Sequence, residues 1–235
     1  MAKNKDYKKI NQTTSSKEVS SKEIKVKNPI FPTYIHIILF VITTFIFFAP
    51  QLLGNAFFWE DFLEYFYPVQ TLAAKEFAKG TIPFWNPYSL AGMPFLADIQ
   101  VGFFYPFHRL MGLFLNSNGM LPIWLVQFVA IIHFFFAQFN FYTLARYLKI
   151  SSWGAIIGAI TYSFAFPIVL HIIHPMIVYH LTWFPLIFYF FKKSLDNNSI
   201  KNGAIAGLIF GFTMLSGHPQ VTLYFAFILG IHFVW

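Results

Sequence analysis

Three carboxylates stand close together at Glu60, Asp61 and Glu64, soon after an apolar run that ends near Leu53. Like charges crowded at a membrane surface repel one another, which favours the uptake of a proton by one of them. A carboxylate that exchanges protons in this way can act as a general base. Asp61 is therefore the candidate catalytic residue, and Glu64 is a candidate substrate-binding residue. The solvated acidic face of an amphipathic helix is the alternative, and the spacing alone leaves both open.

A second group of polar and aromatic residues follows in the same segment. Trp85, Asn86 and Tyr88 stand in one string, and Asp98 and Gln100 stand in the next. Aromatic faces stack on sugar rings, and sugar hydroxyls need amide and carboxylate partners. The Pro and Gly residues between them indicate an ordered loop rather than a linker. All five are candidate substrate-binding residues; an aromatic belt at the lipid headgroups is the alternative.

Basic and amide side chains complete the candidate site. His218 and Gln220 lie in a polar break between two apolar runs, and such breaks are tolerated at membrane depth only inside protein or along a cavity. The candidate partners for an anionic leaving group are Arg109, Lys75, His108 and His218. His171 and His174 have metal-ligand spacing but no carboxylate beside them in the sequence. We therefore assign no metal ligand, and the cofactor stays open, a divalent metal included.

The elements that position these residues are predicted to be membrane helices. Of the 235 residues, 57% are hydrophobic and only 11% are charged, which leaves too little polar surface to cover a soluble globule. The apolar runs lack the alternation of a membrane β-barrel. Cysteine is absent, which excludes thiolate chemistry. We predict an all-α, polytopic transmembrane helix bundle, with spans at about residues 33–53, 121–142, 152–173, 176–191 and 203–216 and an incomplete one at 221–235.

Charge predicts how the bundle sits in the membrane. Residues 1–28 hold eight of the sixteen Lys and Arg residues, and we predict a disordered cytoplasmic tail followed by a transmembrane domain at 29–235. The acidic loop of residues 54–120 is then extracytoplasmic. The formal charge of +7 becomes a signal of topology and not of nucleic-acid binding, so no nucleic-acid partner is expected. The predicted location is the cell membrane, multi-pass, with the lipid bilayer as a partner.

The outer loop is predicted to contain an interfacial helix. Phe62, Tyr65 and Val69 fall on one face at helical spacing, and Lys79 and Gly80 are suited to end the helix. The apolar face is expected to lie against lipid. Four polar residues of the second span are expected to bond neighbouring helices: Gln127, His133, Gln138 and Asn140.

Several strings resemble the YfhO-like bacterial membrane proteins, a family within the broad GT-C class of glycosyltransferases. The resemblance covers roughly residues 30–235, and its most specific strings are Trp-Asn-Pro-Tyr and Gly-His-Pro-Gln. The strings that carry it are Tyr67-Pro68, the run from Gly80 to Tyr88, Gly92-Met93-Pro94, Ala97-Asp98-Ile99-Gln100, Tyr105-Pro106 and Gly217-His218-Pro219-Gln220.

The resemblance implies a GT-C bundle in which the first outer loop carries the catalytic acid residue, a position that Asp61 matches. It implies transfer of a sugar from a polyprenyl-phosphate carrier to a cell-envelope polymer or lipid acceptor on the outer face. Family members are longer, and the last apolar run here is short, so we expect a truncated chain. A transporter or flippase for a lipid-linked sugar, or a noncatalytic scaffold fragment, is the alternative.

Overall fold

The computed structural model describes residues 34–57 and 61–234, and this part of the chain is mostly helical. The predicted tail at 1–28 and the carboxylate of Glu60 lie outside the described residues. The longer helices are α2 (Tyr34–Phe47), α4 (Tyr67–Ala78), α6 (Ile123–Tyr147), α7 (Ser152–Ser163), α9 (Pro175–Asp196), α10 (Ile200–Met214) and α11 (Pro219–Val234). The short elements are α3 (Ala49–Leu52), η1 (Asp61–Phe66), β1 (Trp85–Asn86), β2 (Met93–Pro94), η2 (Ile99–Val101), α5 (Pro106–Met111), η3 (Gly112–Phe114), α8 (Phe166–Leu170) and η4 (His171–Ile173).

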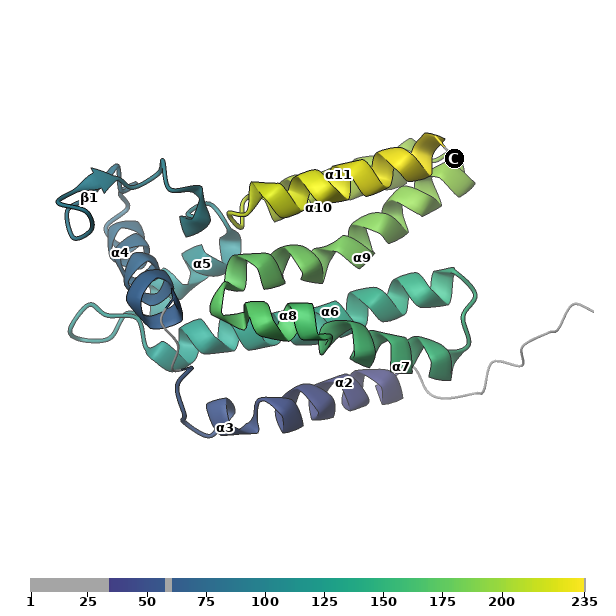
Figure 1. Cartoon of the computed structure of the whole chain (residues 1–235), viewed down its shortest axis with the longest axis horizontal. Coiled ribbons are helices and arrows are strands. Elements are labelled where there is room, and N and C mark those ends of the chain that lie inside the picture. Colours follow the sequence, from purple (N-terminus) through teal and green to yellow (C-terminus); the bar gives the residue numbers. More distant parts are fainter. Residues whose placement is uncertain (1–33, 58–60, 235) are drawn as a thin grey trace, which may run out of the picture.

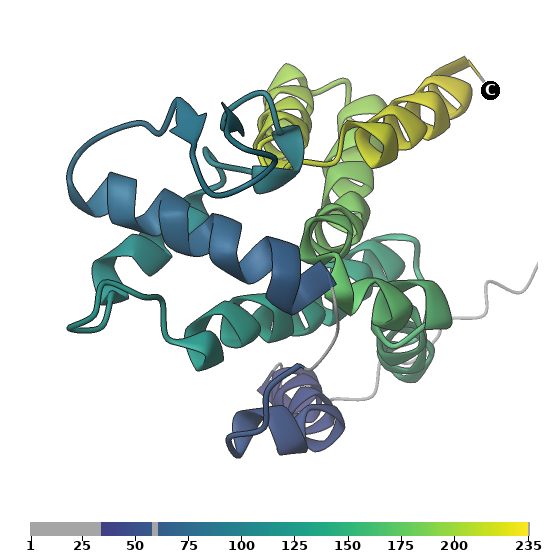
Figure 2. The ribbon, with the colours of Figure 1, turned by 60° about the vertical axis from the view of Figure 1, so that its left-hand side comes forward.

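The long helices form a bundle, and the described residues between 54 and 120 (54–57 and 61–120), here called the loop region, fold over one end of it (Figure 1). Helices α6 and α9 pack on each other at the centre, with α7 and α2 against α6 and with α10 and α11 against α9. Figure 2 shows α4 and the β1–β2 segment beside the end of the bundle, with α2 at its lower edge. Residues far apart in the sequence therefore meet where the loop region joins the bundle.

Two helical stretches, Ile123–Tyr147 and Ser152–Ile173, are long and apolar enough to cross a membrane. The first extends five residues beyond the predicted end at 142. The second is interrupted, because α7 ends at Ser163 and α8 begins at Phe166 with Pro167 in its first turn. Proline lacks a backbone N–H and is therefore well tolerated in the first turn of a helix, where that N–H would have no partner within the helix. The apolar helices α2, α10 and α11 are shorter than a full span.

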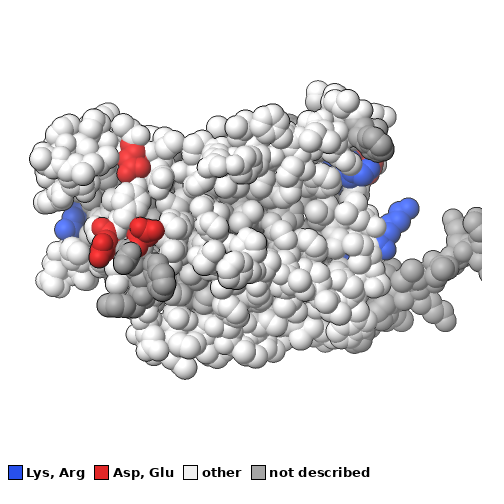
Figure 3. Space-filling model, viewed as in Figure 1, with Lys and Arg blue, Asp and Glu red and all other residues white. Residues whose placement is uncertain are grey.

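The surface of the bundle is apolar between two charged ends. On the face seen in Figure 3, acidic side chains lie at the loop-bearing end, and a band without charge separates them from basic side chains at the other end. Large apolar residues of the bundle helices are exposed, such as Ile46 (67%) and Leu208 (74%). In water such a surface would be unfavourable, whereas lipid tails cover it without cost.

The apolar face of the helix formed by η1 and α4 packs inward. Phe62 is fully buried. Val69 is 6% exposed and contacts a core that includes Phe95 and Phe103. The prediction that this face lies against lipid is therefore wrong. The reason is that residues 95–103 fold back over Val69, while Phe62 packs in the core shared with Phe57 and Phe134, so lipid is excluded from this face. The helix does end as expected, with Lys79 at its C-cap and Gly80 at a φ of +74°.

A buried hydrogen-bond network joins the loop region to the bundle. The Nδ1–H of His133 donates to the carbonyl of Val129 at 2.5 Å, so its Nε2 must accept, and the Tyr105 hydroxyl donates to it at 2.6 Å. The same hydroxyl accepts from Trp183 Nε1 at 2.8 Å. Each group is used in the role that its chemistry allows, so the network fixes the loop region on α6 and α9.

The other polar residues of α6 also bond neighbouring segments. Gln127 binds the backbone of Asn55 and Phe57, with distances of 3.1 and 2.7 Å. Gln138 bonds Thr43 and Thr44 of α2. The amide of Asn140 donates to the carbonyl of Thr182 at 2.9 Å. The prediction of bonds to neighbouring helices is confirmed for Gln138 and Asn140, whereas Gln127 bonds the non-helical segment that follows α3.

Candidate functional site

Asp61 meets a histidine 113 positions away in the sequence. Its Oδ2 lies 2.8 Å from Nε2 of His174, the residue that precedes α9. Asp61 stands in the first turn of η1, where the helix dipole favours a negative charge. The two side chains are 55% and 36% exposed, so a substrate can reach both. The pair leaves Oδ1 of Asp61 available to accept a further proton.

The pair lines a pocket at the junction of loop and bundle, which we call the Asp61 pocket. It contains about 380 Å³ of empty space that is open to solvent. Its lining comprises Asp61, Tyr65, Phe66, Gln100, Ile173, His174 and Met176. Apolar walls with a few converging polar groups are typical of small-molecule sites.

A second pocket lies on the other side of Tyr65, and we call it the Tyr88 pocket. It contains about 610 Å³ of empty space. Its polar lining comprises Glu64, Thr71, Lys75, Asn86, Tyr88 and Ser89, and Tyr65 lines it as well. Tyr65 is the only residue shared by the linings of the two pockets, as far as the described residues show.

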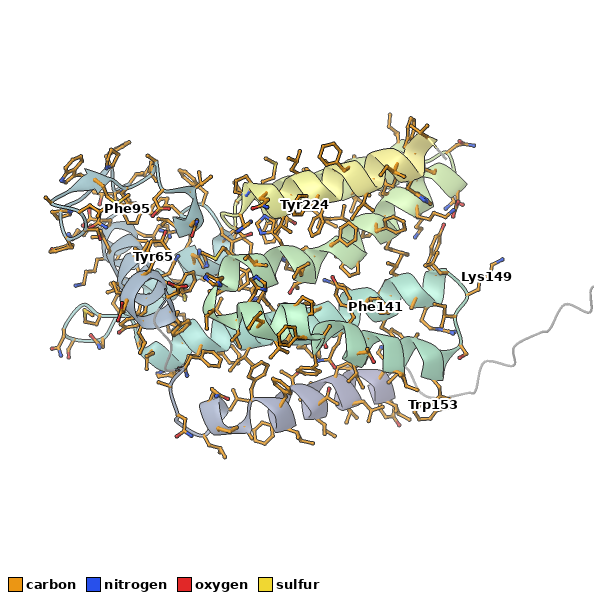
Figure 4. The ribbon with its side chains drawn as sticks, in the orientation of Figure 1. Tyr65, Phe95, Phe141, Lys149, Trp153 and Tyr224 are labelled. Carbon is orange, nitrogen blue, oxygen red and sulfur yellow. The ribbon has the colours of Figure 1, made fainter. Side chains whose placement is uncertain are left out.

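Asp98 holds Tyr65 in this position. The Tyr65 hydroxyl donates to Asp98 Oδ2 at 2.6 Å, while Oδ1 accepts from the backbone N–H of Gln100 at 3.2 Å and caps η2. Burial, and then the Asp98 carboxylate, raise the pKa of Tyr65, so its hydroxyl stays protonated. Figure 4 shows Tyr65 at the loop-bearing end, with Phe95 in the same region. Asp98 thus acts on the site through Tyr65.

The Trp-Asn-Pro-Tyr string forms strand β1 of a short hairpin and the start of its turn. The Asn86 side chain accepts from the backbone N–H of Tyr88 at 3.0 Å and donates to Ser89 Oγ at 3.1 Å. Trp85 pairs with Pro94 across the hairpin and covers Gly92, where a Cβ would lie 2.5 Å from the indole ring. Asn86 and Trp85 shape the turn, and this leaves Tyr88 at the rim of its pocket with 84% of its surface exposed.

Two glycines bring the Gly-His-Pro-Gln string against the loop region. A Cβ at Gly217 would clash with the Ile99 carbonyl oxygen, and one at Gly102 would lie 2.7 Å from that of Ser216. Both residues have positive φ, +102° and +56°. This contact places His218 near the Asp61 pocket, because the adjacent Gly217 touches Gln100, which lines that pocket. His171 and His174 act on His218 electrostatically. Desolvation, more than these neighbours, lowers the pKa of His218.

Arg109 and Gln220 line neither pocket. The Arg109 guanidinium lies 3.7 Å from the centre of the Phe103 ring and donates to the carbonyl of Ala73 at 3.3 Å. Burial lowers its pKa to about 10, so it stays charged at neutral pH and joins α4 to α5. Gln220 is exposed and donates to the Tyr224 hydroxyl of its own helix.

The described residues, 34–57 and 61–234, contain no group of three His, Asp or Glu side chains arranged to hold a metal ion. The closest acid and histidine side chains of the site are Asp61 and His174, which form a pair and not a group of three.

The sequence matches no protein-family model, and the chain matches no curated protein and no solved structure. The resemblance to the YfhO-like family therefore stays a prediction.

The structure thus brings five of the ten predicted site residues into the lining of the two pockets, while Trp85, Asp98, Arg109, His218 and Gln220 line neither. Asp61 and Gln100 line one; Glu64, Asn86 and Tyr88 line the other. Sequence reasoning overlooked Tyr65, which it placed on the apolar face of a helix. Its side chain reaches Asp98, a contact across 33 positions that helical spacing does not contain. His174 was noted for its spacing to His171, and its pairing with Asp61 required the fold.

Stability at acid pH is expected to depend on His108, which lies in the loop region and is 1% exposed. Burial lowers its pKa to about 3, from 6.5. Between these values the unfolded chain binds a proton that the folded protein excludes, so stability should fall as the pH falls, by up to about 1.4 kcal/mol per pH unit. His108→Phe should reduce this slope, measured as unfolding midpoints from pH 7 to pH 4. An unchanged slope would show that other groups govern acid unfolding.

Proposed function

We propose that this chain is a polytopic membrane glycosyltransferase of the GT-C type, which moves a sugar from a polyprenyl-phosphate carrier to a cell-envelope acceptor. The observation that carries the proposal is the hydrogen-bonded pair of Asp61 and His174 in an open pocket where the loop region meets the apolar bundle. At this position a carboxylate can meet both a lipid-linked donor and a water-soluble acceptor.

The orientation follows from charge. Arg146, Lys149, Lys192 and Lys193 lie at or beyond the ends of α6 and α9 that are distant from the loop region, as the position of Lys149 in Figure 4 illustrates. Basic residues favour the cytoplasmic side. The Asp61 pocket is then on the outer face, and the N terminus is cytoplasmic.

The proposed reaction is a displacement with inversion. The acceptor oxygen attacks the anomeric carbon, and the bond from that carbon to the phosphate oxygen breaks with its electron pair on the departing lipid phosphate. Oδ1 of Asp61 takes the proton of the acceptor hydroxyl. His174 positions the carboxylate through its hydrogen bond to Oδ2. His218, beside the pocket, is the proposed hydrogen-bond donor to the departing phosphate.

This assignment revises the candidate partners of the leaving phosphate that the sequence suggested. The Arg109 guanidinium lies over the Phe103 ring and donates to the carbonyl of Ala73. His108 is buried, and its Nδ1 forms a hydrogen bond with the carbonyl of Gly102. Neither lines the Asp61 pocket. His218 therefore remains the candidate partner of the departing phosphate. Lys75 lines the Tyr88 pocket instead.

A transfer assay tests the proposal. Membranes that contain the protein are supplied with a radiolabelled polyprenyl-phosphate sugar, and label is followed both in covalent product and across the bilayer. A covalent product supports a transferase. Movement of the label without product would favour a flippase, and neither result would favour a scaffold, so each of these two outcomes overturns the proposal.

A further inference from the structure

The Tyr88 pocket contains polar groups that the protein itself does not use. Glu64 and Lys75 both line it, and neither forms an ion pair with another described residue. The nearest recorded contact of the Lys75 ammonium is the Met120 sulfur at 3.5 Å, which is a weak acceptor. A solvated charge on a protein surface carries no free-energy penalty, so these two charges do not by themselves require a ligand. Because they have opposite signs and line one pocket, they offer a ligand both a hydrogen-bond donor and an acceptor.

Thr71 supplies a third group of this kind. The residue is 3% exposed, it lines the pocket, and its hydroxyl has no hydrogen-bond partner among the described residues. Other buried threonines of the chain do have one: Thr182 and Thr213 each donate to the carbonyl four positions earlier in their helix. A buried hydroxyl left unpaired is unfavourable, so its place beside a pocket calls for a partner from outside the chain.

The rim of the pocket adds an aromatic ring. Tyr88 is 84% exposed, and the Asn86 turn fixes its backbone. An exposed aromatic face next to a donor, an acceptor and a hydroxyl suits a ligand with an apolar ring face and several hydroxyls, without net charge. A phosphate would be repelled by Glu64, and a simple cation would be repelled by Lys75. A sugar unit satisfies all of these groups together, because its hydroxyls both donate and accept hydrogen bonds.

The position of the pocket suggests which sugar it holds. Tyr65 separates it from the Asp61 pocket, and the hydrogen bond to Asp98 holds this wall in place. A sugar in the Tyr88 pocket would therefore lie one side chain away from the Asp61 carboxylate. We infer that the Tyr88 pocket is a separate carbohydrate subsite that holds a glycosyl unit of the acceptor, with Glu64, Thr71 and Lys75 bonding its hydroxyls. The role as acceptor subsite rests on the proposed function; binding of a sugar does not.

Binding of simple glycosides tests the inference. The full chain in lipid nanodiscs is titrated with the methyl glycosides of glucose, galactose and N-acetylglucosamine, and binding is followed by saturation-transfer NMR. Thr71→Val, which replaces the hydroxyl by a methyl group, should weaken binding about five- to tenfold, as expected for one hydrogen bond. Tyr88→Ala should weaken it by a similar factor or more, through loss of the stacked ring.

Two matched controls separate binding from folding. Phe84→Ala removes an exposed ring of the same hairpin that lines neither pocket, and it should leave glycoside binding unchanged. Thr213→Val removes a hydroxyl that is bonded within its helix, and it should lower the unfolding temperature. Thr71→Val should leave that temperature unchanged or raise it, because no internal hydrogen bond is lost.

Three outcomes would overturn the inference: no glycoside binds, Thr71→Val binds as tightly as the wild type, or Phe84→Ala weakens binding as much as Tyr88→Ala. These outcomes are independent of the transferase proposal. Glycoside binding without any transfer would refute the proposed reaction and keep the subsite. Transfer that depends on Asp61 without glycoside binding would keep the reaction and refute the subsite.

Discussion

Asp61→Asn should lower the rate of sugar transfer by about 100- to 10,000-fold, the usual contribution of a general base. The amide keeps the size of the side chain, and its oxygen can still accept the hydrogen bond from His174. It cannot take up a proton from the acceptor hydroxyl at neutral pH. The loss should therefore fall on turnover, while the protein inserts into the membrane as before. Initial rates with radiolabelled carrier sugar, normalised to the protein in the membrane, measure the effect.

Glu76→Gln is the matched control for this variant. Glu76 is a carboxylate of the same loop region, but it pairs with Lys79 and Thr81 at the far end of α4 and lines neither pocket. Transfer should be unchanged in this variant. A wild-type rate for Asp61→Asn would refute the role of Asp61, and an equal loss in both variants would point to a general effect of charge.

Gly217→Ala should destabilise the protein by about 2 to 5 kcal/mol, since it combines backbone strain with overpacking. The φ of +102° is unfavourable for any residue with a Cβ. The added methyl group would also meet the carbonyl oxygen of Ile99 and lie 3.0 Å from that of Gln100. Backbone atoms cannot rotate away as a side chain can, so the segments must separate. Because Gln100 lines the Asp61 pocket, transfer should fall as well.

Gly207→Ala provides the comparison. Gly207 lies within α10, and a Cβ there would meet nothing within 4 Å. Alanine is favoured over glycine in a helix by about 1 kcal/mol, so this variant should be as stable as the wild type or more stable. Thermal unfolding in detergent compares the two variants. If both unfold at the same temperature, the loop region and the Gly-His-Pro-Gln segment are not packed as described.

The sequence by itself determined the chemistry of the elements. Apolar runs without alternation require helices, and two of them, at Ile123–Tyr147 and Ser152–Ile173, are long enough to cross a membrane. Gln138 and Asn140 of α6 also behave as predicted, because a polar group in an apolar helix has few partners except a neighbouring helix. The Pro, Gly and Asn residues around Asn86 likewise predicted an ordered turn. These are local rules, which act over one or two turns of chain.

Only the tertiary structure decided which residues share a site. The pairing of Asp61 with His174 spans 113 positions, and the wall formed by Tyr65 and Asp98 spans 33. Helical spacing placed Tyr65 on a face that was expected to meet lipid, because periodicity shows that a face is apolar but not what covers it. Residues 95–103 cover it here, and two glycines let the loop region approach the bundle closely. Contacts of this kind depend on how the chain folds back on itself, and no pattern along the sequence contains that information.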